Sequence, residues 1–143
     1  MNKSIKILVV DDSLIMRKNI TRMLEELGHN VVSEAKTGKE AIAHYSMQKP
    51  DLVTMDITMP DMDGIDAVTN IKKRNPEAKI IMITAHGQED MVIKSIKAGA
   101  KAYILKPITP IKIDEAINKL FNIEKVEERS ENIKDLDEDD FSM

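Results

Sequence analysis

The chain contains no cysteine among its 143 residues. Disulfide frameworks, thiolate metal sites and cysteine nucleophiles are therefore excluded. Aromatic side chains are also scarce, because tryptophan is absent and only two tyrosines and two phenylalanines occur. Proteins that bind single-stranded nucleic acid stack its bases on aromatic rings, so this composition argues against a nucleic-acid partner of that kind.

Long apolar runs are absent as well. No run reaches the roughly 20 residues that a helix needs to cross a bilayer, and the opening MNKSIKILVV lacks the pattern of a signal peptide. We therefore expect no membrane insertion and a cytoplasmic location. The length and an apolar fraction of 42% are sufficient for one domain with a substantial core.

The charge is unevenly distributed along the chain. Residues 124–143 hold nine Asp or Glu against three Lys or Arg, a local net charge of −6, whereas the whole chain carries −4. We therefore predict one folded domain over residues 1–123 and an acidic tail over residues 124–143. Runs of like charge with few apolar residues are typical of a solvated end of a chain.

Within the domain, strands are predicted to alternate with helices. Branched apolar runs predict strands, and apolar residues spaced three or four apart, preceded by capping residues such as Ser13 and Thr37, predict helices. The expected strands are 5–10, 30–35, 51–56, 78–84 and 102–105, and the expected helices are 13–27, 37–48, 64–74, 88–98 and 109–121. Five strands alternating with five helices predict an α/β domain with a parallel sheet that is covered on both faces.

Polar side chains stand where the predicted strands end. Asp11 and Asp12 follow the first strand, and Asp56 ends the third. Thr84 ends the fourth strand, and Lys106 follows the fifth. Ligands of open α/β sheets bind at the carboxyl ends of the strands, so we expect these five residues to meet in one crevice.

The chemistry of this set is consistent with a phosphoryl site. Three carboxylates in one pocket cannot all stay ionised without a compensating cation, and a hard divalent ion, above all Mg²⁺, suits oxygen ligands. Lys106 and the hydroxyl of Thr84 are suited to binding the oxygens of an anion. An aspartate nucleophile in such a site would carry the phosphoryl group covalently.

Each residue also has a simpler interpretation. Asp12 or Ser13 could do no more than cap the following helix, and Thr84 could bond only to backbone. Taken alone, Lys106 could be an ordinary surface lysine. The combination at matching strand ends is what favours a site. The three histidines show no metal-ligand spacing, and we expect His29 and His44 to lie at the surface.

Four segments resemble the receiver domains of bacterial two-component response regulators, and the resemblance covers residues 5–121. The segments are VVDDS at 9–13, DLVTMDITMPDMDGID at 51–66, IIMITA at 80–85 and GAKAYILKP at 99–107. The resemblance implies a flavodoxin-like fold, with five parallel strands in the order 2-1-3-4-5 and five helices.

The resemblance also assigns roles to the acidic residues. Asp56 matches the phosphoacceptor, and Asp11, Asp12 and Asp56 match the Mg²⁺ carboxylates. The backbone carbonyl of Thr58 matches a further metal ligand. Thr58 and His86 occupy positions that tune the hydrolysis of the phosphorylated form.

Three further residues match the switch machinery of the family. Thr84 matches the hydroxyl that follows the phosphoryl group, and Lys106 matches the phosphate-binding lysine, whose bond to Pro107 is expected to be cis. Tyr103 matches the aromatic residue that changes rotamer. The domain is expected to catalyse its own phosphorylation on Asp56 and its slow autodephosphorylation.

The implied partners follow from the same resemblance. The phosphodonor is expected to be a histidine kinase or a phosphotransfer protein. A downstream protein is expected to bind the face formed by the fourth helix (88–98), the fifth strand (102–105) and the last helix. About 20 residues of tail are too few for a DNA-binding domain. We therefore expect a monomeric, stand-alone regulator of the chemotaxis or phosphorelay type.

Two alternatives remain open at this point. A haloacid-dehalogenase-type phosphatase also uses Mg²⁺ and an aspartate nucleophile after a strand. Its signature places a second Asp two residues later, where this chain has Thr58 after Asp56 and Ser13 after Asp11. The chain could also be the receiver fragment of a longer regulator.

Overall fold

The structure is a computed structural model that describes residues 4–57, 59 and 64–121. Thr58 and the predicted acidic tail lie outside the described residues, as does Asp63, the residue before α3. The predicted division at residue 123 therefore stays a prediction. None of the helices in the described part of the chain has both the length and the apolar character of a transmembrane helix.

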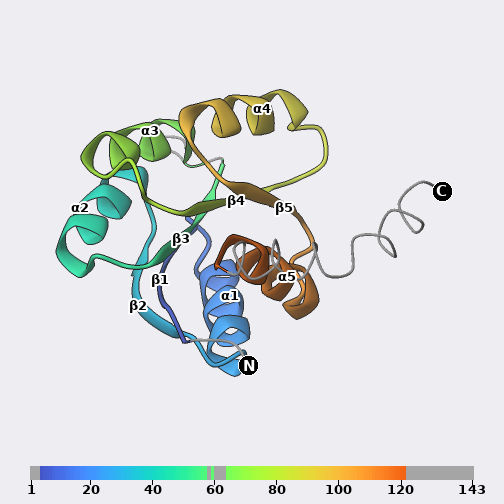
Figure 1. Ribbon diagram of the computed structural model, residues 1–143. Coiled ribbons are helices and arrows are strands. Elements are labelled where there is room, and N and C mark those ends of the chain that lie inside the picture. Colours follow the sequence, from blue (N-terminus) through green and yellow to red (C-terminus); the bar gives the residue numbers. More distant parts are fainter. Residues whose placement is uncertain (1–3, 58, 60–63, 122–143) are drawn as a thin grey trace, which may run out of the picture.

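The described strands form one parallel sheet (Figure 1). Its order is β2-β1-β3-β4-β5, which confirms the predicted flavodoxin-like topology. The strands are β1 (Lys6–Val10), β2 (Asn30–Ala35), β3 (Leu52–Asp56), β4 (Ile80–Thr84) and β5 (Ala102–Leu105). β3 and β4 are buried along their whole length, as expected for central strands with helices on both faces.

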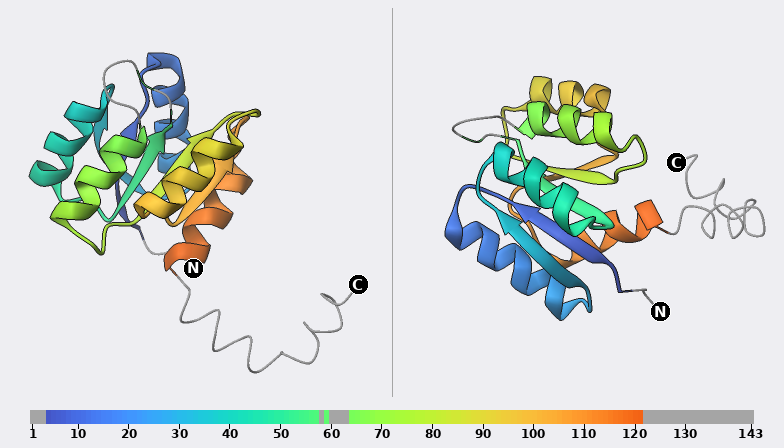
Figure 2. Two further views of the ribbon diagram at one scale, coloured as in Figure 1. Left: turned by 90° about the horizontal axis from the view of Figure 1, so that it is seen from above. Right: turned by 90° about the vertical axis from the view of Figure 1, so that its left-hand side faces the viewer.

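Helices cover both faces of the sheet, as Figure 2 shows from two sides. The helices are α1 (Leu14–Glu26), α2 (Gly38–Gln48), α3 (Gly64–Arg74), α4 (Glu89–Ala98) and α5 (Pro110–Phe121). α1 and α5 pack on one face, around Ile20, Leu24, Ile113 and Ile117. The other face is covered by α2, α3 and α4. All ten elements begin and end within two residues of the predicted bounds.

Side-chain caps fix where the first two helices begin. Ser13 Oγ accepts the N–H of Met16 at 3.2 Å, and Thr37 Oγ1 accepts the N–H of Glu40 at 3.0 Å. The start of α2 differs from a capping box in its second bond, because Glu40 Oε1 accepts the N–H of Lys36 and not that of Thr37.

The prediction that His29 lies at the surface is wrong. Its side chain is 6% exposed, and Nδ1 accepts the N–H of Ile5 at 3.3 Å. The ring lies just after α1, where the chain turns back into β2. Burial lowers the pKa of His29, and nearby Asp114 opposes that shift. His44 is partly exposed and bonds to Ser33 through Nδ1 at 2.8 Å.

Candidate functional site at the carboxyl edge of the sheet

The strand ends bring the three predicted carboxylates together. Asp11, Asp12 and Asp56 each offer an oxygen, and these oxygens all lie within 4.8 Å of one another. Asp11 and Asp56 are buried, whereas Asp12 is exposed and keeps one side of the cluster open to solvent. Asp11 and Asp56 are 45 positions apart in the sequence, and they lie together because β1 and β3 are neighbouring parallel strands that end at the same edge of the sheet.

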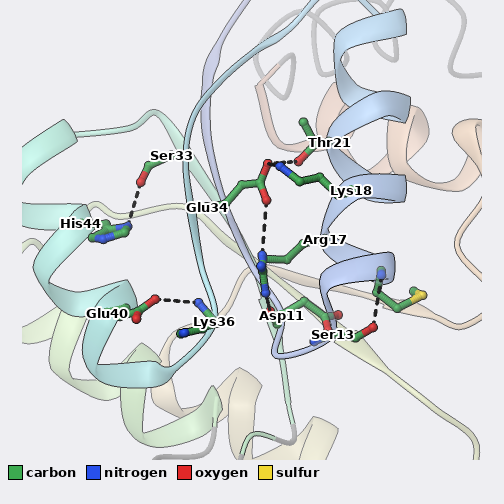
Figure 3. Close-up of polar contacts among 11 residues, drawn as sticks. Asp11, Ser13, Arg17, Lys18, Thr21, Ser33, Glu34, Lys36, Glu40 and His44 are labelled. Atoms are coloured by element: carbon green, nitrogen blue, oxygen red, sulfur yellow. Dashed lines mark hydrogen bonds and ion pairs between the residues drawn. The ribbon is translucent and has the colours of Figure 1, made fainter.

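Asp11 is held from three directions (Figure 3). Its N–H donates to the carbonyl of Ala35 at 3.0 Å, and its carbonyl accepts Nη1 of Arg17 at 2.9 Å. Its Oδ1 accepts the N–H of Ser13 at 2.8 Å. The other oxygen, Oδ2, is buried and has no hydrogen-bond partner among the described residues. A buried carboxylate oxygen without a partner is costly unless a cation completes the site.

The electrostatics of Asp11 also favour a cation at this site. Burial raises the pKa of Asp11 above its ordinary value, and the neighbouring Asp12 carboxylate adds to that rise. The Ser13 N–H and the charges of Lys106 and Arg17 oppose it but do not cancel it. A divalent cation with oxygen ligands would neutralise the cluster and occupy the open oxygen. The residues present therefore fit a metal ion held by Asp11, Asp12 and Asp56.

Thr84 and Lys106 reach the same edge from the two neighbouring strand ends. Asp56 pairs with Ile83 in the sheet, which is the residue before Thr84. The N–H of Lys106 donates to the carbonyl of Thr84 at 2.7 Å. The Lys106–Pro107 bond is cis, which confirms that expectation. The charge of Lys106 is also close enough to Asp11 to lower its pKa against the effect of burial.

The hydroxyl of Thr84 bonds to a residue that sequence reasoning missed. Thr84 Oγ1 donates to Oε1 of Gln88 at 3.2 Å, and the same Oε1 accepts the N–H of Ala85 at 2.9 Å. Gln88 stands just before α4. Its place at a helix start, four residues after Thr84, is the only signal in the sequence that could have suggested this contact.

A second missed residue supports the loop that carries Lys106. Lys112, in the first turn of α5, donates from Nζ to the carbonyls of Leu105 and Pro107, each at 3.0 Å. These two carbonyls flank Lys106. No sequence pattern distinguishes Lys112 from other surface lysines, because the contact depends on how α5 folds back beside β5.

Tyr103 points outward in this structure. Its side chain is 53% exposed, and it borders a hollow of about 290 Å³ between β5 and α4. Thr84 and Val92 line the same hollow. Space for an inward aromatic ring therefore exists next to the strand-end hydroxyl.

The comparisons with known proteins agree with this geometry. The family model of the response regulator receiver domain matches residues 7–118. The chemotaxis protein CheY of Thermotoga maritima is 50% identical over 115 residues, which cover 80% of this chain and 96% of that protein. CheY of Bacillus subtilis is 50% identical over 117 residues, covering 82% of this chain and 98% of that protein.

A solved structure shows the same similarity in three dimensions. A chain in the crystal structure of the CheX-CheY-BeF3-Mg+2 complex from Borrelia burgdorferi aligns with a TM-score of 0.78 at 37% identity. The alignment covers 81% of this chain and 88% of that chain. The comparisons give no support to the phosphatase alternative.

Proposed function

The chain belongs to the response regulator receiver domain family, and on that premise we propose that it is a signalling switch phosphorylated on Asp56. The observation that carries this proposal is the cluster of Asp11, Asp12 and Asp56, in which one buried oxygen of Asp11 has no hydrogen-bond partner within the described part of the chain. Such a cluster is suited to holding Mg²⁺ beside an aspartate nucleophile.

The transfer step follows from the chemistry of the strand-end residues. A carboxylate oxygen of Asp56 forms a bond to phosphorus while the bond from phosphorus to the donor's histidine nitrogen breaks, and that nitrogen keeps the electron pair. Lys106 and the hydroxyl of Thr84 bind the oxygens of the incoming phosphoryl group. Asp11, Asp12 and Asp56, with the carbonyl of Thr58 as the family resemblance implies, would hold Mg²⁺, which would neutralise charge in the transition state when bound.

The same site is expected to catalyse its own slow dephosphorylation. A water molecule attacks phosphorus and breaks the bond to the Asp56 oxygen, which regenerates the carboxylate and releases inorganic phosphate. By the family resemblance, Thr58 and His86 occupy the positions that tune this hydrolysis, and Thr58 lies outside the described residues. His86 is exposed in this structure and therefore open to solvent.

The output rests on the hollow beside Tyr103. When Asp56 is phosphorylated, the hydroxyl of Thr84 leaves Gln88 and turns toward the phosphoryl group. Tyr103 then rotates into the vacated space, because a close-packed region adopts discrete arrangements. The surface formed by α4, β5 and α5 changes shape, and a downstream protein binds the changed form more tightly.

The partners proposed for this chain follow from its relatives. We propose a histidine kinase or phosphotransfer protein as phosphodonor, a chemotaxis-type or phosphorelay role, and action as a monomer in the cytoplasm. The similar structure from Borrelia burgdorferi is of a complex that contains CheX and CheY, and by analogy we propose that the α4, β5 and α5 surface binds a downstream protein.

The test of the proposed function uses a small phosphodonor. The protein is incubated with acetyl phosphate with and without Mg²⁺, and its intact mass is measured. One phosphoryl group is expected on the wild type, and none is expected on Asp56→Asn or without a divalent ion. Asp51→Asn is the matched control, because Asp51 lies at the opposite end of β3, where it accepts the N–H of Lys6. Labelling that persists in Asp56→Asn would contradict the assignment.

A further inference from the structure

Arg17 connects the metal-binding strand end to two other elements (Figure 3). It lies in α1, and its Nη1 donates to the carbonyl of Asp11 at the end of β1 at 2.9 Å. Its Nε donates to Oε1 of Glu34 in β2 at 3.3 Å. One guanidinium therefore ties together β1, α1 and β2 directly beside the carboxylate cluster.

Glu34 holds Arg17 in turn. Its second oxygen, Oε2, accepts Nζ of Lys18 at 3.1 Å and Oγ1 of Thr21 at 3.2 Å. The side chains of Arg17 and Glu34 are 13% and 20% exposed, whereas that of Lys18 is 63% exposed. The Arg17–Glu34 pair is therefore shielded from solvent, and its geometry is better fixed than that of an ordinary surface ion pair.

We propose that Arg17 is a positioning residue for the metal site, which holds the peptide of Asp11 so that its carboxylate stays within the cluster. This inference rests on the proposed function. The backbone of Asp11 is held on both sides of its Cα: its N–H donates to the carbonyl of Ala35, and its carbonyl accepts from the side chain of Arg17. Without Arg17 the carbonyl of Asp11 loses its side-chain donor. The orientation of the Asp11 carboxylate is then less well fixed.

The charge of Arg17 makes the proposal sharply testable. A cation beside a cation-binding site repels the metal, so removing it should strengthen Mg²⁺ binding if charge were its only role. A positioning role predicts the opposite sign, since the metal then binds a less well-ordered carboxylate. The two explanations are therefore separated by the direction of the change in affinity.

The experiment measures the dissociation constant of Mg²⁺ by calorimetry and by amide NMR titration of the unphosphorylated protein. We expect Arg17→Met to raise it about ten-fold, the lower end of the range seen when residues that support metal ligands are removed. Lys18→Met is the matched control, because it removes an adjacent positive charge bonded to the same Glu34 but has no contact with Asp11. The dissociation constant of Mg²⁺ from the Lys18→Met variant should stay unchanged or fall.

A second variant guards against misfolding and against a charge effect. Arg17→Met combined with Glu34→Gln removes the pair as a unit, so the local net charge is unchanged and no buried carboxylate is left without its partner. We expect weaker Mg²⁺ binding here too. An unchanged or lower dissociation constant in either folded variant overturns the inference. If the wild type itself does not bind Mg²⁺, the proposed function fails and this inference fails with it.

Discussion

At the residue scale, the site is defined by a buried charge whose environment is incomplete. Asp11 accepts one backbone N–H through Oδ1, yet its Oδ2 has no partner among the described residues. Burial and the Asp12 carboxylate together raise its pKa, so the metal-free protein holds an ionised group in an unfavourable place. A cation bound at this carboxylate relieves the unfavourable electrostatic energy, and that relief contributes to the affinity for the cation.

Removing one carboxylate should therefore stabilise the metal-free protein. Asp12→Ala is the cleaner variant, because Asp12 is exposed and adds to the repulsion at Asp11. We expect unfolding in EDTA to occur a few degrees higher than in the wild type, equivalent to about 1 kcal/mol for a domain of this size. The measurement is thermal unfolding by circular dichroism. With saturating Mg²⁺ the order should reverse, and equal melting in EDTA would show that Lys106 already compensates the cluster.

His29 gives the protein a second dependence on ionisation, far from the site. Burial lowers its pKa in the folded state, with Asp114 opposing, so the unfolded chain binds a proton more readily. The contribution of the neutral His29 ring to the free energy of unfolding is fully present above the unfolded pKa of about 6.5 and is lost as the pH falls below that value. Urea unfolding from pH 8 to pH 5 should show a downward slope that His29→Asn flattens. An identical slope in the variant would contradict this role.

At the scale of elements, the site exists because parallel strands end at one edge. The places of Asp56, Thr84 and Lys106 after β3, β4 and β5 could be read from the sequence, since the alternation of strands and helices is regular. The burial of His29 and the contacts of Lys112 could not. They depend on how loops and helices meet in space, and no local spacing encodes such meetings.

The start of α3 lies close against the end of β3. The N–H of Gly64 donates to the carbonyl of Ile57 at 2.7 Å, and a Cβ at this position would collide with the backbone carbonyl of Asp56. Gly64→Ala must push α3 away from β3. We expect a loss of about 1–3 kcal/mol in unfolding free energy, as for other overpacked positions, together with weaker Mg²⁺ binding.

Urea unfolding and a Mg²⁺ titration of Gly64→Ala check this prediction. The stability effect comes from packing and should be present in EDTA as well as in Mg²⁺. Wild-type stability in this variant would show that α3 can shift without cost, and the close approach would then have no structural role.

At the scale of the whole molecule, α5 packs against the core as far as its last residue. Leu120 and Phe121 pack against the core cluster of α1 and α5, and Nζ of Lys79 lies 5.5 Å from the ring centre of Phe121. The acidic composition of residues 124–143 contrasts with this packed helix. The boundary near residue 123 stays a prediction, which truncation can test.

Deleting residues 125–143 should therefore leave the melting temperature nearly unchanged. The control is a longer deletion, of residues 120–143, which removes Leu120 and Phe121 from the core cluster and should lower it by many degrees. The measurement is the melting temperature of both truncated proteins, compared with that of the full chain. A large drop in the shorter deletion would mean that the acidic segment packs on the domain.

We expect phosphorylation of Asp56 to change the surface formed by α4, β5 and α5. Backbone NMR of the full chain, recorded in Mg²⁺ before and after addition of acetyl phosphate, tests it most directly. We predict shifts at Thr84 and Gln88 that continue through Tyr103 into α4, and their absence in Asp56→Asn. Shifts confined to the loops around Asp56, with Tyr103 and α4 unchanged in a fully phosphorylated sample, would contradict the account.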